Sequence, residues 1–276
     1  MRRATQADVA KIDSFLERHI ETSMFPLSNL RAYGLDRPHL RALSIWIDPE
    51  TDGLLAFTRE GMILPQLPGF ADWAQLKPLL AGRPLIGCIG EASQVRALLS
   101  ACGLEERPMN NNSDEPLMSL ALRDLAEQKD AGELVPLESV PREVIDAWRA
   151  AYHRETLGTP AAQAGYLARQ DIERYIAADT HRALLVERTP VAMTGFNAIC
   201  GDVVQIGGVF TPAHLRQQGY AGRALRLHLA EAASQGKRRA ILFAASEAAV
   251  GLYKRIGFQI IGSYAMCLFS SPETIE

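Results

Sequence analysis

The chain has 276 residues, of which 47% are hydrophobic, and its formal net charge is −3. This length exceeds the common size of one domain, so we expect two domains of roughly 130 residues, each with its own core. The Lys and Arg residues are scattered along the chain. That distribution argues against a nucleic-acid partner, which requires a basic patch or stripe.

Further classes are excluded by what the sequence lacks. The N-terminal segment MRRATQADVAKIDSF has no apolar centre, and no stretch approaches the ~20 apolar residues of a membrane span. We therefore expect neither a signal peptide nor a membrane partner. No His, Cys, Asp or Glu cluster has metal-ligand spacing, so we expect no metal. No cysteine pair has CxxC spacing, which favours reduced thiols and a cytoplasmic location. The cysteines are Cys88, Cys102, Cys200 and Cys267.

The first half is predicted to alternate helices and strands. Apolar residues at helical spacing predict a helix over 5–20, which is followed by an apolar turn between helices at 21–35. The remaining predicted elements are strands at 42–48 and 53–68, a helix at 73–82, a strand at 84–91, a helix at 91–104 closed by Gly103, and a strand at 117–122. Residues 105–116 (EERPMNNNSDEP) are interpreted as a polar loop and 126–133 as a linker. The predicted domains are therefore 1–125 and 126–276.

The second half repeats this order of elements with little residue identity. The predicted elements are a strand at 134–138, helices at 141–156 and 162–178, strands at 182–188, 190–200 and 203–210, a helix that ends near 233, a strand at 239–245, a helix at 247–256, and a final strand or hairpin at 258–269. The repetition favours two similar domains.

The segment HLRQQGYAGRAL places weak helix formers where a helix must begin. A helix N-terminus has four unpaired N–H groups and partial positive charge. Gly219, Ala221 and Gly222 would let an anion approach that backbone, and Arg216 adds a charged donor. The pattern predicts a site for phosphate or pyrophosphate. The alternative is that the small residues only let the helix pack closely on a sheet. A Walker A loop and a GxGxxG fingerprint are both absent.

Two motifs in sequence resemble the GCN5-related N-acetyltransferases (the GNAT superfamily). Arg216, Gly219 and Ala221 meet the family pattern of Arg or Gln, two residues, Gly, any residue, then Gly or Ala. The segment SEAAVGLYKRIGF (246–258) resembles its second motif, Leu-Tyr followed by Gly-Phe. The resemblance covers 134–269. The first half is interpreted as a degenerate copy, because its segment IGEASQVRALL has one Gly and no preceding basic residue where a phosphate turn would stand.

The resemblance implies an α/β fold of tandem acetyltransferase-like domains. Each would have a mixed, mostly antiparallel sheet flanked by helices, and the C-terminal domain would have a splayed parallel strand pair. It implies acetyl-CoA as cosubstrate, with pantetheine paired to the backbone of Val209 and Thr211 and pyrophosphate held by the N–H groups of 217–222. The implied cofactor-binding residues are Gly208, Val209, Phe210, Thr211, Arg216, Gln217, Gln218, Gly219, Tyr220, Ala221, Gly222 and Ser246.

The implied catalytic residue is Tyr253, which matches the family tyrosine that protonates the leaving thiolate. Ser246 stands where the family often has Asn, so it would cap the helix or touch the cofactor. Asp202 and Gln205 are the polar residues near the strand on which many members carry a Glu base. Asp202 suits a turn and Gln205 cannot accept a proton, so solvent would deprotonate the amine. His153 is expected at a solvated helix end.

The function expected from these residues is acetyl transfer to a primary amine of a small molecule or a protein. A non-catalytic acyl-CoA sensor or interaction module is the alternative, because the base is missing and the Asn is replaced. A mononucleotide-binding protein and a longer acyl donor also remain open. The protein would be a monomer with two pseudo-symmetric domains or a homodimer.

Overall fold

The computed structural model describes residues 1–126 and 132–276, which divide into two compact units. The first unit comprises Met1–Pro116 and Gly262–Glu276, and the second comprises Leu117–Ile261. The predicted boundary after residue 125 cuts the chain once, whereas the units cut it twice, because the end of the chain packs with the first unit. The predicted linker at 126–133 lies mostly outside the described residues.

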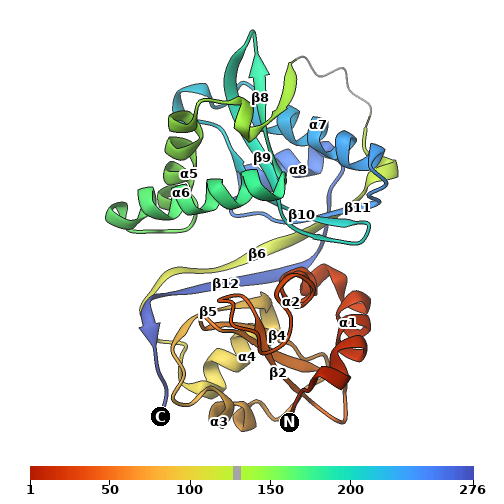
Figure 1. Cartoon of the computed structure of the whole chain (residues 1–276), viewed down its shortest axis with the longest axis vertical. Helices are drawn as coiled ribbons and strands as arrows, with labels where there is room; N and C mark the ends of the chain where they lie inside the picture. The colour runs from red at the N-terminus through yellow and green to blue at the C-terminus, as the bar shows by residue number, and fades with distance from the viewer. Residues whose placement is uncertain (127–131) are drawn as a thin grey trace. The chain divides into compact units, whose positions relative to one another are not determined.

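In the first unit, helices cover both faces of a mixed sheet (Figure 1). Its strands are β1 (Arg2–Arg3), β2 (Leu43–Ile47), β3 (Leu54–Thr58), β4 (Met62–Gln66), β5 (Leu85–Glu91), and parts of β6 (Met109–Ala121) and β12 (Gln259–Glu273). Its helices are α1 (Val9–Arg18), α2 (Ile20–Tyr33), α3 (Lys77–Leu80) and α4 (Ala92–Cys102). The strand order is β1-β2-β3-β4-β5-β12-β6, and β4 and β5 are parallel.

The second unit has the same layered plan. Its strands are the end of β6, β7 (Glu133–Pro136), β8 (His181–Val186), β9 (Thr189–Cys200), β10 (Val203–Phe210) and β11 (Arg239–Phe243), in the order β6-β11-β10-β9-β8-β7. Its helices are α5 (Arg142–Thr156), α6 (Ala161–Ala178), α7 (Tyr220–Ser234) and α8 (Glu247–Ile256). Apolar side chains of α5 and α6 pack on β8 and β9, and those of α7 and α8 pack on the other face. The expected α/β class is confirmed, with parallel and antiparallel strands in a single mixed sheet in place of the separate sheets expected.

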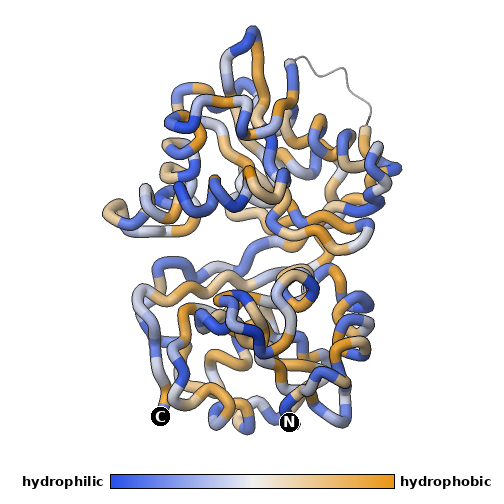
Figure 2. Tube along the Cα trace, viewed as in Figure 1, coloured by the Kyte–Doolittle hydropathy of each residue, from blue (hydrophilic) through white to orange (hydrophobic). Residues whose placement is uncertain are grey.

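The last strand of each half of the sequence, β6 and β12, is divided between the two units. Residues 117–121 of β6 pair antiparallel with β11, and residues 264–268 of β12 pair antiparallel with β5. In Figure 2 the strands of both units are rich in hydrophobic colour, which marks the two cores. The strands that pair with β6 and β12 are therefore remote in sequence, and no local sequence pattern predicts this pairing.

Two local predictions were wrong. Residues 109–116, interpreted as a polar loop, are part of the 13-residue strand β6. Side chains alternate between half-buried and exposed there, and Arg96 of α4 binds Asp114 and Asn112, so tertiary contacts outweigh the low strand propensity of Asn and Asp. Residues 21–35, interpreted as a turn, lie mostly in α2, which contains Pro26.

Candidate functional site

The second unit contains the splayed strand pair that the sequence analysis expected. Strands β10 and β11 pair in parallel only where 203–205 face 239–241. Strand β10 continues to Phe210, while the end of β11 pairs with β6 on its other side. Over the described residues, the two strands therefore diverge beyond Gln205 and leave the second half of one edge of β10 without a strand partner.

A β-bulge lies on the diverging part of β10. Gly207 faces Gly195 of β9 and Phe210 faces Met193, so two residues of β10 oppose one residue of β9. Gly208 adopts a φ of 64°, which favours glycine. A bulge leaves the backbone of its extra residue outside the ladder. Backbone groups at Gly208 and Val209 are thus available to a ligand, beside the position where the family resemblance implied pantetheine contacts.

The start of α7 lacks a side-chain cap. Gly219 is its N-cap residue, has a φ of 77°, and has no atom within 4 Å of the position where a Cβ would stand. Helices α4 and α8 differ, because Glu91 accepts hydrogen bonds from the N–H groups at the start of α4 and Ser246 accepts one at the start of α8. Helices α5 and α6 also lack a side-chain cap, but each begins after a proline, Pro141 and Pro160, whereas α7 begins after a glycine. The first-turn N–H groups of α7 therefore face open space and suit an anion.

The residues at the start of α7 do not all serve the same purpose. A Cβ on Gly222 would come within 2.8 Å of the Leu252 side chain of α8, so this glycine permits close helix packing. Tyr220 is half-buried, and the guanidinium of Arg223 lies 5.5 Å from its ring. Packing, the alternative weighed for the whole motif, explains Gly222 but does not explain Gly219.

Arg216 lies at the rim of this turn, where it is held by two partners. Its Nε donates to the carbonyl oxygen of Thr211 at 3.0 Å, and its Nη2 pairs with the Glu155 carboxylate at the end of α5. Neighbouring Gln217 adopts a φ of 63°, so the turn presents its backbone in an unusual conformation. Gln218 is exposed beside it. The exposed fraction of the Arg216 side chain is 45%, so its remaining donors can still reach a ligand.

The predicted residues of α8 lie within the core of the unit or at the helix start. Tyr253 is buried, and its ring meets that of Phe258 edge-on, with centroids 5.9 Å apart. Ser246 Oγ accepts a hydrogen bond from Ala249 N at 3.2 Å, so the hydroxyl caps the helix. Gly257 ends the helix in the left-handed conformation. A role of Tyr253 in protonating a thiolate stays a prediction.

A buried polar cluster that was not predicted lies on α5 and α6. Arg149 donates to Asp171 at 2.7 Å, and His153 Nε2 lies 2.9 Å from the same carboxylate. Arg174 also pairs with Asp171. Burial alone would raise the pKa of Asp171, but the His153 hydrogen bond and the two arginines hold that pKa below its usual range. The expectation of a solvated helix end was therefore wrong for His153, which is buried.

His181 connects this cluster to the bulge. Its ring stacks on Tyr175, with centroids 3.5 Å apart, and lies over Gly195, where any Cβ would collide with it. Burial first, then the charge of Arg149, holds the pKa of His181 well below its usual value, so the ring is neutral. Its Nδ1 lies 2.9 Å from Thr180 Oγ1. Its Nε2 has no hydrogen-bond partner among the described residues and points toward Gly208.

Polar residues on inward helix faces were the missed signal. Arg149 and His153 are four residues apart on α5, and Asp171 and Tyr175 are four apart on α6, so each pair shares a face. On the strand itself, Gln205 is buried, and its Oε1 has no partner among the described residues. The structure thus places no carboxylate on the strand segment 203–210.

The first unit also contains two parallel strands that diverge, but its described residues show no counterpart of the start of α7 after the first of them. Its parallel strands β4 and β5 pair only where 62–63 face 87–88. The segment that follows β4 is 67–73 (LPGFADW), whereas the predicted equivalent of the phosphate turn, IGEASQVRALL, forms the end of β5 and the start of α4. That assignment was wrong because the turn must follow the first strand of the pair. Glu91 also occupies the N-terminus of α4 with its own carboxylate.

The described residues contain neither a metal-binding cluster nor a membrane-spanning helix. Within 1–126 and 132–276, no group of three or more His, Cys, Asp or Glu side chains is placed to hold a metal ion. In the same residues, every helix is too short or too polar to cross a bilayer.

Comparison with known proteins finds a family model that matches most of the second unit. Residues 142–258 match the model of the acetyltransferase (GNAT) family. No curated protein sequence matches the chain.

Solved structures resemble the chain over nearly its full length. A Drosophila protein has a TM-score of 0.60 and 14% identity, with 97% of each chain covered. A GCN5-related N-acetyltransferase from Kribbella flavida has a TM-score of 0.56 and 15% identity, covering 92% of this chain and 95% of its own. Another from Sphaerobacter thermophilus has a TM-score of 0.52 and 15% identity, covering 100% and 96%. At these identities the likeness shows the fold alone.

Proposed function

Since residues 142–258 belong to the GNAT family of acetyltransferases, we propose that the protein transfers an acetyl group from acetyl-CoA to a primary amine. The observation that carries the proposal is the uncapped start of α7 directly after the bulged, diverging strand β10. An anion-binding backbone and a free strand edge then follow each other within 203–222. A pyrophosphate joined to an extended amide chain needs that combination.

The donor would bind through backbone groups more than through side chains. Backbone N–H groups of 217–222 would hold the pyrophosphate, in the open space before Gly219. The edge of β10 from Gly208 to Thr211 would pair with the pantetheine amides, as an added strand does. Arg216, fixed by Thr211 and Glu155, would add a charged donor at the rim.

The chemistry requires one bond to form and one to break. The amine nitrogen attacks the thioester carbonyl, a C–N bond forms, and the C–S bond breaks to release CoA thiolate. Val209 N–H would stabilise the negative charge on the carbonyl oxygen during the attack. Solvent would take the proton lost by the amine, because Gln205 on the strand cannot accept one. Tyr253 would give its phenolic proton to the thiolate and regain one from water.

Titration calorimetry tests the donor assignment. The purified protein is titrated with acetyl-CoA, CoA, ATP and NAD in parallel. Micromolar binding of acetyl-CoA and CoA alone supports the proposal. Absence of CoA binding refutes it, and ATP or NAD binding that competes with CoA favours a nucleotide site instead.

A second function is supported by the residues of the strand and of α8. Gln205 is no base, and the Ser246 hydroxyl is engaged as a helix cap. A non-catalytic acyl-CoA sensor would keep the binding groups and need neither. Release of CoA thiol with a panel of amines, including lysine peptides, distinguishes the two functions. Turnover with any amine excludes the sensor.

A further inference from the structure

The first unit contains a basic pocket. It has a volume of about 320 Å³, which lies within the range of small-molecule sites. Its lining residues come from five segments of the unit and are Arg3, Asp36, Arg37, Ala42, Ser44, Phe57, Thr58, Arg59, Gly61, Arg83, Pro84 and Leu85. Every one of them belongs to the first unit, so the pocket is complete within it.

This pocket is not a second copy of the α7 site. Its residues at 57–61 precede β4, and those at 83–85 stand at the start of β5. The parallel strands diverge at their other ends, after Ile63 and Cys88. The pocket therefore lies at the opposite end of the strand pair, away from the position that corresponds to the phosphate turn.

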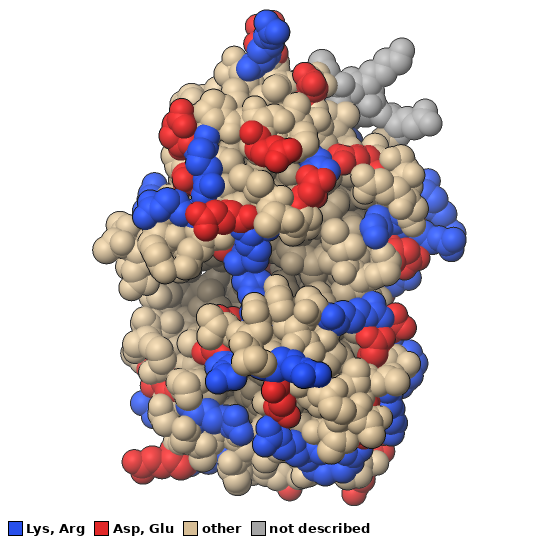
Figure 3. Space-filling model, viewed as in Figure 1, with Lys and Arg blue, Asp and Glu red and all other residues tan. Residues whose placement is uncertain are grey.

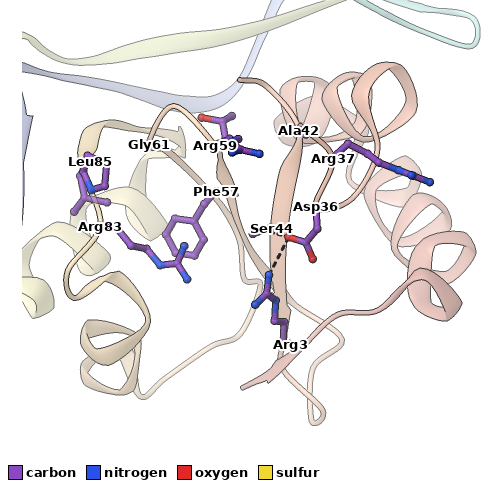
Figure 4. Close-up of a pocket in the computed structure, with 12 residues that line it drawn as sticks. Arg3, Asp36, Arg37, Ala42, Ser44, Phe57, Arg59, Gly61, Arg83 and Leu85 are labelled. Carbon is purple, nitrogen blue, oxygen red and sulfur yellow. Dashed lines mark hydrogen bonds and ion pairs between the residues drawn. The ribbon is translucent and has the colours of Figure 1, made fainter. Parts of the chain in front are cut away.

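Two guanidinium groups converge over one indole ring. The Cζ atoms of Arg3 and Arg83 lie 5.5 and 4.9 Å from the ring centroid of Trp46. Arg83 also lies 5.5 Å from the Phe57 ring, and the two are side by side in Figure 4. Its Nε donates to the carbonyl of Leu79 at 2.9 Å, which fixes the plane of the guanidinium. The aromatic rings thus preorganise Arg83, and its terminal nitrogens remain available as donors.

The positive charge of the pocket is only partly balanced. Asp36 pairs with Arg3 at 3.0 Å and accepts from Ser44 Oγ at 2.6 Å. Arg59 and Arg83 have no ion pair with any of the described residues. Arg37 lines the rim, but in Figure 4 it points away from the other arginines. One carboxylate therefore stands against Arg3 and Arg83, which converge over Trp46, and against Arg59, which lines the same pocket.

The concentration of arginines is local. The first unit as a whole carries 12 Lys and Arg against 17 Asp and Glu. Figure 3 shows charges of both signs interspersed on the visible face. A general excess of basic residues does not explain the pocket. Like charges that converge without partners destabilise a fold unless a ligand of opposite charge joins them.

We propose that this pocket binds a small-molecule anion that bears phosphate or carboxylate groups. Arg83 would make a bidentate contact, since its planar guanidinium matches both groups and is already oriented. Arg59 and Arg3 would supply further charged donors from the other sides. The proposal is independent of the acetyl transfer assigned to the second unit.

Calorimetry on the full chain in low-salt buffer tests the proposal, with citrate and inorganic pyrophosphate as probes. We expect saturable 1:1 binding of at least one probe. Arg83→Gln and Arg59→Gln should each weaken it about tenfold or more, because each removes a charge-assisted hydrogen bond. Arg18→Gln is the matched control, because Arg18 is an exposed residue of α1 outside the pocket and contacts Phe15. It should leave the affinity within about twofold.

Two further variants separate the possible outcomes. Arg59 is exposed and makes no ion pair within the described residues, so Arg59→Gln preserves the fold even if Arg83→Gln does not. Gly219→Glu closes the other candidate anion site, so it should remove only pyrophosphate bound at the start of α7 and should leave citrate binding to the Arg83 pocket unchanged. The proposal is overturned by absence of saturable binding. Equal weakening in Arg18→Gln overturns it, and so does binding lost in Gly219→Glu but kept in Arg83→Gln.

Discussion

Gly219→Glu is the sharpest test of the proposed acetyl-CoA site. The added side chain enters the space before α7, where no atom lies within 4 Å of the Cβ position. Gly236, just beyond the other end of the same helix, is a matched control. It also has a positive φ, 86° against 77°, and an equally open Cβ position. Gly219→Glu and Gly236→Glu thus carry the same charge and a similar backbone strain of about 1–2 kcal/mol.

The magnitude of the effect follows from the charges. Two like unit charges 4 Å apart repel by ~1 kcal/mol in water and by ~4 kcal/mol near a protein surface. A pyrophosphate carries at least two charges, so Gly219→Glu should cost at least ~2 kcal/mol of binding. That corresponds to a roughly 30-fold weaker affinity for acetyl-CoA.

The assay is calorimetric titration of both variants with acetyl-CoA, with urea unfolding to compare their stabilities. Gly236→Glu should bind acetyl-CoA within about twofold of the parent protein, because α7 separates its charge from the site by more than a Debye length. An unchanged affinity in Gly219→Glu, or an equal loss in both variants, would falsify the assignment of the turn.

Three other predictions concern the second unit. Tyr253→Phe should lower kcat roughly 100-fold without weakening acetyl-CoA binding; equal rates of thiol release would leave Tyr253 as a packing residue only. Gly208→Val should lower the free energy of unfolding by ~1–3 kcal/mol, because φ is 64° and a Cβ would lie 3.2 Å from His181 Nε2; unchanged urea unfolding would contradict this. Burial first, then the charge of Arg182, lowers the pKa of His228 from 6.5 to about 3, so the unfolded chain takes up the proton first. The stability that neutral His228 contributes is present above pH 6.5 and is lost as the pH falls toward 3, by about 3 kcal/mol at pH 4. His228→Phe, which can keep the stack on Phe196, should remove that part of the loss between pH 7 and 4 in denaturant titrations; an unchanged loss would refute the cause.

The predicted donor site could be recognised from the sequence because its residues lie close together in the chain. Strand β10, the turn and the start of α7 occupy 203–222 without interruption. Backbone conformation there depends on residues close in sequence, such as Gly219 in the left-handed region. The second motif was equally local, with Ser246 as cap and Gly257 as stop of α8. The family resemblance rested on these same segments.

The remaining polar residues of the candidate site could be identified only from the tertiary structure. Arg149 of α5 and His181 of β8 approach Gly208 only after the sheet has formed, and Asp171 of α6 then binds Arg149. The burial that keeps His181 neutral is likewise a property of packing and leaves no mark on the composition. Inward polar residues on α5 and α6 hinted at a cluster, but they did not say which partners close it.

The division of the chain into two units could also not be predicted from local sequence patterns alone. The sequence by itself determined the order of most elements and the glycine at the start of α7, because periodicity and capping act over a few residues. Only the tertiary structure decided that β12 joins β5, that β6 runs through an Asn-rich segment, and that four arginines spread over 3–83 line one pocket. Those outcomes depend on pairing and burial between segments far apart in sequence, whose energies are set by the neighbours that the fold supplies.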